Sequence, residues 1–240
     1  AQLESPRLAA ELLLASVLEC QRIELYTRFD HSPSPEQLTA YRELVRRAAQ
    51  QEPVAYLIGV KEFYSLPFLV TPAVLVPRPE SELLVDHAVK HLRQLDRPGT
   101  VWDVCTGSGC VGLAIAQQVP TARVLATDIC PDALAIAQAN ADALDLAPRV
   151  TCAQADLLTR PAAFNGAELF DTITANPPYV GTDDWVAPSV VHEPDLALYA
   201  GSTGMDIIGR LIAAAPAQLT PGGCLIMEFG MGQAQAIGEL

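Results

Sequence analysis

The sequence is poor in basic residues. Its 240 residues include 15 Lys and Arg against 28 Asp and Glu, which gives a formal net charge of −13. The acidic excess is uneven, because residues 1–75 hold 9 acidic and 7 basic residues whereas residues 76–240 hold 19 and 8. Proteins that hold nucleic acid through its phosphates usually carry the opposite charge. The composition therefore disfavours a general nucleic-acid-binding protein, and we expect no stable nucleic-acid partner.

Long hydrophobic runs are also missing. Half of the residues are apolar, but no stretch approaches the roughly 18 consecutive apolar residues of a membrane-spanning helix. The first residues lack the basic segment and cleavage site that are typical of a secretory signal. We therefore expect a protein that works without a membrane.

The six cysteines contain no Cys-x-x-Cys pair, and the four histidines form no ligand-like group with them. In a chain of this length with a large apolar fraction, reduced core thiols are favoured over a disulfide framework. His87 and His91 lie one helical turn apart but lack the further ligands of a zinc site. We expect no metal centre and a cytoplasmic location.

Residues 1–59 are expected to form a small helical domain. Apolar residues recur at helical spacing over residues 8–20. Ser34 followed by Pro35 is typical of the start of a second helix, which we expect to reach about Gln50. Aromatic and β-branched residues separated by prolines then predict a β-hairpin that links the two parts of the chain over residues 60–78.

From residue 79 onward, predicted strands and helices alternate. Strands are expected at residues 100–105, 123–127, 149–154, 169–174 and 224–229. Helices are expected at residues 80–93, 110–118, 131–144 and 205–219. This alternation is typical of a mainly parallel sheet that is covered on both faces. The expected fold class is therefore α/β with a small helical domain in front of it.

A glycine-rich turn follows the first of these strands. Gly107, Gly109 and Gly112 satisfy the pattern G-x-G-x-x-G, and Asp128 ends the next strand. Glycines allow a backbone to approach a ligand closely, and such an acid can accept both hydroxyls of a ribose. The pattern predicts a ligand with a ribose, although the same glycines also serve tight packing of a strand on a helix.

Two further acids define the chemistry of this ligand. Asp103 precedes the glycines, where a carboxylate would repel a pyrophosphate but attract the cationic amino acid portion of S-adenosylmethionine. Asp156 follows the third strand and suits the amino group of an adenine. Three acids at three strand ends fit a cationic nucleoside better than a polyanionic one. We therefore expect S-adenosylmethionine as cofactor and S-adenosylhomocysteine as product.

The tetrapeptide Asn-Pro-Pro-Tyr at residues 176–179 directly follows a predicted strand. Pro177 and Pro178 fix two φ angles and remove two N–H donors, so the turn is rigid. It presents two acceptors, the side-chain oxygen of Asn176 and the carbonyl oxygen of Pro177, which can hold both hydrogens of a planar –NH2 group. Tyr179 offers a flat face to that group. Asn-Pro also begins ordinary turns, but the carboxyl end of a strand is where α/β sheets bind ligands.

The glycine turn and this tetrapeptide together resemble the class I methyltransferases, whose sheet is Rossmann-like, that act on a planar nitrogen. Residues 77–82 (PRPESE) are similar to the PRPETE segment of the HemK family, the protein-(glutamine-N5) methyltransferases of class 1 peptide chain release factors. Further matching segments are Glu193-Pro194, Gly201, Gly204-Met205, Pro221-Gly222-Gly223 and Met227-Glu228-Phe229-Gly230. The resemblance covers nearly the whole chain, and it implies that some N-terminal residues and a final part of the sheet lie outside this sequence.

The resemblance implies a substrate-recognition domain at residues 1–59, the hairpin linker at 60–78 and a catalytic domain at 79–240. It assigns the cofactor to Asp103, Cys105, Thr106, Gly107, Ser108, Gly109, Asp128, Asp156, Leu157 and Asn176. It assigns the glutamine of the release factor's Gly-Gly-Gln motif to Asn176, Pro177, Pro178 and Tyr179. Arg78 and Glu193 are candidates either for substrate contact or for holding a loop.

Two positions depart from the family pattern, which usually has glycine at Cys105 and threonine at Ser81. Cys105 places a side chain beside the ligand loop, whereas Ser81 keeps the hydroxyl group. Two other functions fit parts of the sequence. An Asn-Pro-Pro-Tyr turn also serves N6-methylation of adenine in DNA or RNA, in which the base is flipped out. A methyltransferase-like fold can also serve as a non-catalytic binding protein, although the intact tetrapeptide argues against that.

Overall fold

The structure is a computed structural model that describes residues 5–27, 30, 32–161 and 167–240. The chain divides into two compact units. One contains Ala1–Val60 and Val186–His192, and the other contains Lys61–Trp185 and Glu193–Leu240. The division into residues 1–59, 60–78 and 79–240 stays a prediction.

The described part of the first unit is helical. Its elements are α1 (Pro6–Val17), α2 (Glu24–Thr27), α3 (Pro35–Ala49) and α4 (Val54–Ile58). The expected start of α3 is confirmed, because the side chain of Ser34 accepts from the backbone N–H of Gln37 while Gln37 accepts from that of Ser34. Such a capping box satisfies two N–H groups that a helix start leaves unpaired. Gly59 directly follows α4 and terminates the helix in the left-handed conformation, with φ of 75°.

A short hairpin follows, shorter than the range of 60–78 that the sequence suggested. Its strands are β1 (Val60–Phe63) and β2 (Leu66–Leu69), and the residues at its turn, Tyr64 and Ser65, have φ angles of 51° and 60°. Two positive φ angles are the mark of the tight turn that matches the twist of paired strands. The prolines beyond β2 keep residues 70–78 out of the strands, since proline cannot donate to a sheet.

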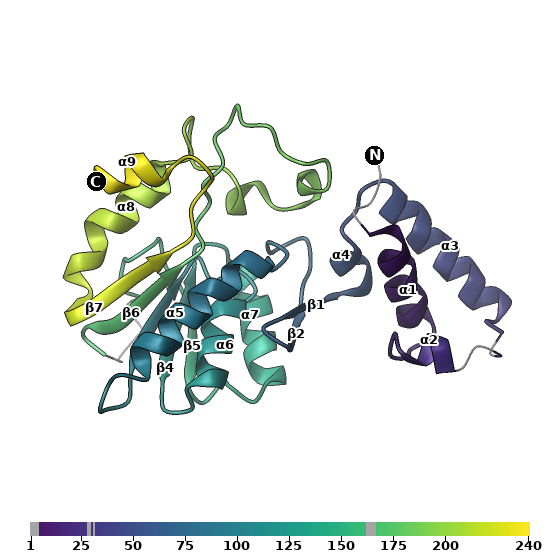
Figure 1. The fold of residues 1–240 in the computed structure, drawn as a ribbon, viewed down its shortest axis with the longest axis horizontal. Coiled ribbons are helices and arrows are strands. Elements are labelled where there is room, and N and C mark those ends of the chain that lie inside the picture. The colour runs from purple at the N-terminus through teal and green to yellow at the C-terminus, as the bar shows by residue number, and fades with distance from the viewer. Residues whose placement is uncertain (1–4, 28–29, 31, 162–166) are drawn as a thin grey trace. The chain divides into compact units, whose positions relative to one another are not determined.

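The second unit is built on a five-stranded parallel sheet with the strand order β5-β4-β3-β6-β7 (Figure 1). The strands are β3 (Thr100–Val104), β4 (Arg123–Asp128), β5 (Val150–Gln154), β6 (Phe170–Ala175) and β7 (Leu219–Met227). The α-helices are α5 (Glu82–Leu92), α6 (Cys110–Gln118), α7 (Pro131–Ala143), α8 (Asp206–Ala214) and α9 (Ala234–Gly238). The predicted α/β fold with a parallel sheet is confirmed.

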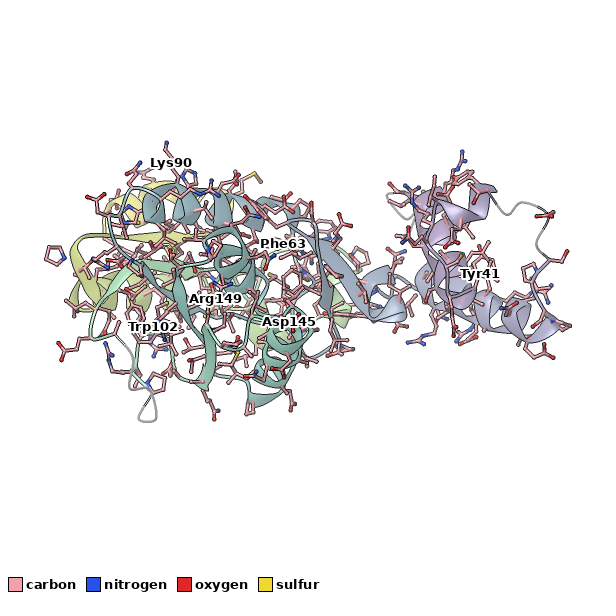
Figure 2. All side chains as sticks on the ribbon, turned by 90° about the horizontal axis from the view of Figure 1, so that it is seen from below. Tyr41, Phe63, Lys90, Trp102, Asp145 and Arg149 are labelled. Carbon is pink, nitrogen blue, oxygen red and sulfur yellow. The ribbon has the colours of Figure 1, made fainter. Side chains whose placement is uncertain are left out.

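Both faces of the sheet are covered by apolar side chains. Along β3, Val101 belongs to a core cluster with residues of α5, α6 and α7, whereas its neighbour Trp102 belongs to a second cluster with residues of α8. This alternation follows from the two-residue period of a strand. Trp102, which Figure 2 labels in the second unit, is fully buried, and its indole N–H donates to Thr127 Oγ1 at 2.8 Å.

The last helix and the last strand differ from the expected ranges. α8 ends at Ala214 instead of reaching residue 219, because Pro216 interrupts the α-helix and a single 3₁₀ turn replaces it. β7 starts at Leu219, five residues before the expected start at residue 224. The sequence from 219 to 223 contains proline and two glycines, so it favours a turn, yet Phe170 N donates to Gln218 O and begins the pairing with β6.

Two polar side chains hold the second unit together away from its core. Asp171, at the start of β6, accepts a paired hydrogen bond from the Arg97 guanidinium and further bonds from Thr100 and Thr220. Asn140, on α7, is buried and bonds to both the N–H and the carbonyl of Leu69 on β2. No helix among the described residues is long and apolar enough to cross a membrane.

Candidate active site

A cavity of about 220 Å³ opens at the carboxyl end of the sheet, inside the second unit. Its wall contains residues that follow β3, β4, β5 and β6, which is where open α/β sheets bind ligands. The predicted cofactor residues in this wall are Asp103, Cys105, Thr106, Gly107, Ser108, Asp128, Asp156, Leu157 and Asn176. Of the predicted substrate residues, Asn176 and Pro178 line the cavity. The topology therefore brings together most of the residues that the sequence singled out.

Asp103 holds the glycine turn from beneath. Its Oδ2 atom accepts from Thr106 Oγ1 at 2.5 Å and from Gly112 N at 3.1 Å, and its Oδ1 atom accepts from Thr174 Oγ1 at 2.7 Å. Burial raises the pKa of this carboxyl to about 6, although the three hydrogen bonds favour its charged form. A direct contact of Asp103 with the cofactor stays a prediction. The contacts in the structure give it a role in shaping the turn.

Gly112 is explained by the same carboxylate. A β-carbon at this position would stand 3.0 Å from Asp103 Oδ2 and 3.1 Å from Asp103 Cβ. A side chain here would push Asp103 or the first turn of α6 aside by a few tenths of an ångström. The third glycine of the motif therefore serves packing, as the sequence allowed.

Asp128 connects the ends of two strands. Its Oδ2 atom accepts from the backbone N–H of Gly107 at 2.9 Å, and its Oδ1 atom accepts from that of Cys130 at 3.0 Å. Burial raises its pKa above the ordinary value. Each carboxylate oxygen has a second lone pair, so Asp128 can still accept hydrogen bonds from a ligand in the cavity.

Cys105 occupies the position at which the family usually has glycine, and its backbone is in the left-handed conformation with φ of 56°. This conformation is the ordinary reason for a glycine, because a β-carbon adds a steric cost there. The thiol lies within the cavity wall, and burial raises its pKa. The departure from the family therefore replaces an unstrained residue with a strained one.

Asp156 and Leu157 lie on the wall near α8. Asp156 is half-exposed and accepts from the guanidinium of Arg210 at 2.7 Å. Arg210 also lines the cavity, and no motif in the sequence marks it. An adenine amino group at Asp156 would share this carboxylate with the arginine. The predicted contact with adenine therefore stays a prediction, and Arg210 joins the candidate site.

The Asn176–Tyr179 turn is held by two side chains from other elements. Asn176 Nδ2 donates to Ser81 Oγ at 3.0 Å, and Ser81 Oγ donates to Glu228 Oε2 at 2.6 Å. The hydroxyl of Tyr179 donates to the other oxygen of Glu228 at 2.9 Å. Burial and the neighbouring Glu228 carboxylate raise the pKa of Tyr179. Glu228 therefore connects both ends of the tetrapeptide.

A second clamp holds the backbone of the same turn. Gln233 Nε2 donates to the carbonyl oxygen of Tyr179 at 3.0 Å and to that of Thr203 at 3.3 Å. Gly204 passes close to the same Tyr179 carbonyl with φ of 71°. The loop around residue 204 and the segment after β7 thus both contact the backbone of Tyr179.

Arg78 and Glu193 bind each other. Glu193 is buried and forms an ion pair with Arg78, and its other oxygen accepts from the backbone N–H of Val76 at 3.0 Å. These contacts hold the loop before α8 against the segment that leads into α5. Of the two roles that the sequence left open, loop holding has contacts in the structure, and substrate contact stays a prediction.

Ser81, Glu228 and Gln233 were not among the predicted site residues. The signal for Glu228 is in the register of the sheet, because Ala175 pairs with Met227, so the residues that follow each strand, Asn176 and Glu228, are neighbours. This neighbourhood can be predicted from the sequence only if β6 is already known to lie beside β7. Glu228 lies inside the Met227–Gly230 segment, which the resemblance matched without giving it a role.

Comparisons with known proteins agree along the whole chain. A family model described as the PrmC N-terminal domain matches residues 1–59, and one described as the methyltransferase small domain matches residues 79–230. The release factor glutamine methyltransferase of Rhodopirellula baltica is 47% identical over 94% of this chain and 77% of its own length. The protein of that name from Geobacter sulfurreducens is 42% identical over 98% of this chain and 80% of its own length.

Solved structures support the fold. A methyltransferase from Pyrococcus furiosus matches with a TM-score of 0.53 at 18% identity, covering 82% of this chain and 84% of that one. The catalytic domain of hMettl16, solved with an RNA hairpin, matches with a TM-score of 0.57 at 18% identity over 74% of this chain and 66% of that one. At this identity the likeness concerns the methyltransferase fold alone. With relatives up to 47% identical over most of both chains, the chain belongs to the family of release factor glutamine methyltransferases.

Proposed function

We propose that this protein transfers a methyl group from S-adenosylmethionine to the side-chain amide nitrogen of a glutamine in a class 1 peptide chain release factor. The glutamine is that of the Gly-Gly-Gln motif, and the reaction takes place in the cytoplasm. The family supports the reaction class and the release factor as substrate. The six cysteines, all free in the structure, agree with a reducing compartment.

The observation that carries this proposal is the state of the acceptors at the Asn176–Pro177 turn. Asn176 lines the cavity, and its Nδ2 atom donates one hydrogen bond to Ser81 Oγ. Within the described residues, neither Asn176 Oδ1 nor the carbonyl oxygen of Pro177 accepts a hydrogen bond. Two open acceptors match the two N–H bonds of a primary amide.

The cavity wall also fits a cationic nucleoside cofactor. It contains three carboxylates, those of Asp103, Asp128 and Asp156, and one cationic side chain, Arg210, which is paired with Asp156. A wall of this charge attracts a sulfonium and repels a pyrophosphate. A β-carbon at Gly107 would meet no atom of the chain within 4 Å, so the turn leaves open space at that glycine.

S-adenosylmethionine, when bound, supplies a methyl group on a positively charged sulfur, which is an electrophile. Asp128 would hold the ribose hydroxyls, and the backbone of Cys105–Gly109 would surround the methionine portion. Asn176 Oδ1 and Pro177 O hold both hydrogens of the glutamine –NH2 group, which draws electron density toward nitrogen and fixes its orientation. Tyr179 provides a flat face for the amide. These groups act by positioning and electrostatics.

The proton balance needs no strong base. The glutamine nitrogen would form one bond to the methyl carbon while the methyl–sulfur bond breaks and S-adenosylhomocysteine leaves, and the nitrogen would afterwards lose one proton to solvent. An amide is barely basic, so the nitrogen depends on the two acceptors to keep its hydrogens in place while the new bond forms.

The direct test incubates the protein with S-adenosylmethionine labelled in the methyl group, a purified class 1 release factor, and a DNA or RNA duplex. We expect label on the release factor, and none when its Gly-Gly-Gln glutamine is changed to alanine. Label on the nucleic acid alone would favour adenine methylation instead. Tight binding of S-adenosylhomocysteine without any transfer would favour a non-catalytic binding protein.

A further inference from the structure

We propose that Ser81 and Glu228 act as positioning residues that fix which way the Asn176 amide faces, and so make the site select a glutamine amide over a carboxylate. The proposal rests on the proposed function and adds a determinant of specificity to it. Ser81 and Glu228 come from the segment before α5 and from the end of β7, so the arrangement depends on three parts of the fold.

The direction of each hydrogen bond follows from counting protons. An ionised carboxylate can only accept, so Glu228 takes the single hydroxyl proton of Ser81. Ser81 Oγ has then no proton left and can only accept from its other neighbour. The atom of Asn176 that faces Ser81 at 3.0 Å must therefore be the –NH2 group. Glu228 thus sets the orientation of the Asn176 amide through two successive hydrogen bonds.

Burial makes this arrangement strict. Ser81 is 1% exposed, so water cannot replace either partner easily. The opposite orientation of Asn176 would place two acceptors, Asn176 Oδ1 and Ser81 Oγ, against each other with no hydrogen between them. Leaving buried polar groups unpaired in this way costs about 1–3 kcal/mol per group.

The other oxygen of Glu228 serves the last residue of the turn. It accepts from the hydroxyl of Tyr179 at 2.9 Å, so the ring is held by the same carboxylate that orders Ser81. One acid therefore aligns the group that holds the amide hydrogens and the flat face beside it. A substitution at Glu228 is expected to disturb both, whereas a substitution at Ser81 disturbs only the first.

The consequence for specificity is a matter of donors and acceptors. With Asn176 Oδ1 turned to the cavity and Pro177 O beside it, the site offers two acceptors and so suits an –NH2 group. A glutamate side chain of the same shape would bring an oxygen without a hydrogen to the same place. If the Asn176 amide were free to turn, its –NH2 group would donate to that oxygen, and the turned amide would also bind glutamine in the reversed, unproductive orientation.

The experiment compares Ser81→Val, which has the size of threonine without the hydroxyl, with Ser81→Thr, which keeps the hydroxyl. Methyl transfer to the release factor is measured together with the Kd for the release factor and for its Gly-Gly-Gln→Gly-Gly-Glu variant. We expect Ser81→Val to lower kcat by roughly 10- to 100-fold, the range for misplaced reacting groups. It should also lower the binding preference for glutamine over glutamate, given by the ratio of the two Kd values, by about 10-fold. Ser81→Thr should restore at least most of both losses.

Glu228→Gln provides a second, independent variant. A glutamine at 228 can donate to Ser81, which reverses the bond to Asn176, so we again expect a lower kcat and a weaker preference for glutamine. Glu80→Gln is the matched control, because Glu80 is an exposed carboxylate next to Ser81 and its change removes the same charge. Binding of S-adenosylhomocysteine, measured by calorimetry, should stay within about 2-fold in all variants, because Asp128 takes its hydrogen bonds from Gly107 and Cys130 and not from the substituted residues.

The outcomes separate the two proposals. If the unchanged protein puts no methyl group on the release factor, the proposed function fails, and the specificity role of Ser81 and Glu228 fails with it. If the unchanged protein is active and Ser81→Val keeps both its kcat and its glutamine preference, only the positioning role is overturned. Equal losses in Ser81→Val and Ser81→Thr would also overturn it, because they would point to packing.

Discussion

A β-carbon on Gly204 would stand 2.0 Å from the carbonyl oxygen of Tyr179. Gly204 also has φ of 71°, so the loop before α8 can approach the Asn176–Tyr179 turn only with a glycine at this position. Gln233 Nε2 donates to the same carbonyl oxygen at 3.0 Å and would itself stand 2.8 Å from the added β-carbon. The backbone of Tyr179 is thus fixed by contacts that are separate from those of its side chain.

We expect Gly204→Ala to destabilise the protein and to lower methyl transfer, because the loop and the Tyr179 backbone must move apart. Gly222→Ala is the matched control, since Gly222 has φ of 83° but no atom within 4 Å of an added β-carbon. Both variants pay the cost of a left-handed residue, and only Gly204→Ala adds a collision, worth about 1–3 kcal/mol. Denaturant unfolding and kcat check this, and similar losses in both variants would contradict it.

Asn176→Ala and Asp128→Ala should divide catalysis from cofactor binding. Asn176→Ala removes an acceptor for the substrate hydrogens, so transfer should be abolished while the affinity for S-adenosylhomocysteine changes little. Asp128→Ala removes the predicted ribose acceptor and also releases the N–H groups of Gly107 and Cys130. We expect it to weaken the cofactor affinity by at least 10-fold more, about 1.4 kcal/mol. Calorimetry measures both affinities, and equal losses would refute the assigned roles.

Cys105→Gly should be neutral or stabilising, by up to about 1 kcal/mol, because glycine adopts the left-handed conformation without steric cost. Cys105→Val should be destabilising by about 1–3 kcal/mol, since a β-branched side chain is least compatible with a positive φ. The free energies of unfolding of the two variants give the comparison. A glycine variant less stable than the valine variant would show that packing of the thiol outweighs the backbone strain.

The Asp171 carboxylate should make stability depend on pH below about pH 4. Burial alone would raise its pKa, but the hydrogen bonds from Arg97, Thr100 and Thr220 lower it to about 2. A carboxyl whose pKa is lower in the folded state stabilises the fold above its unfolded pKa of about 3.9, and this contribution disappears as the pH falls toward 2. The stability difference between the unchanged protein and Asp171→Asn should therefore be largest at pH 6 and shrink by pH 3.

Asp96→Asn serves as the control for this pH dependence. Asp96 is an exposed carboxylate shortly before Arg97 in the chain. Chemical denaturation at pH 6 and pH 3 should show little effect of this substitution at either pH. A difference for Asp171→Asn that stays constant from pH 6 to pH 3 would contradict the role of its charge.

The sequence predicts the fold well where periodicity and local chemistry agree. The predicted range of α6 matches the observed Cys110–Gln118, because a glycine turn starts that helix and its apolar residues follow one another without interruption. The start of β7 was missed because Pro221 and two glycines favour a turn, whereas the backbone of β6 provides pairing partners that only the folded chain contains. Pairing between distant strands thus overrode the local preference.

The candidate site was predictable to the extent that its residues directly follow strands along the chain. Asn176 and Asp128 are found in this way, and both lie in the cavity wall. Glu228 reaches the site through the side-by-side placement of β6 and β7, and Ser81 through the placement of the turn before α5, neither of which a single sequence states. Arg210 depends on the way α8 lies against the end of β5, and its ion pair with Asp156 has no local pattern at all.

Asn140 and Glu82 have a consequence for the hairpin of β1 and β2. Two strands of four residues each are too short to set their own alignment. The side-chain amide of Asn140 accepts from the backbone N–H of Leu69 and donates to its carbonyl oxygen, as the backbone of a neighbouring strand would. Glu82 accepts from the backbone N–H of Tyr64. Hydrogen bonds to residues of α7 and α5 therefore fix the position of the hairpin. Lengthening or shortening the chain between residues 70 and 78 should leave these hydrogen bonds between the hairpin and the two helices unchanged.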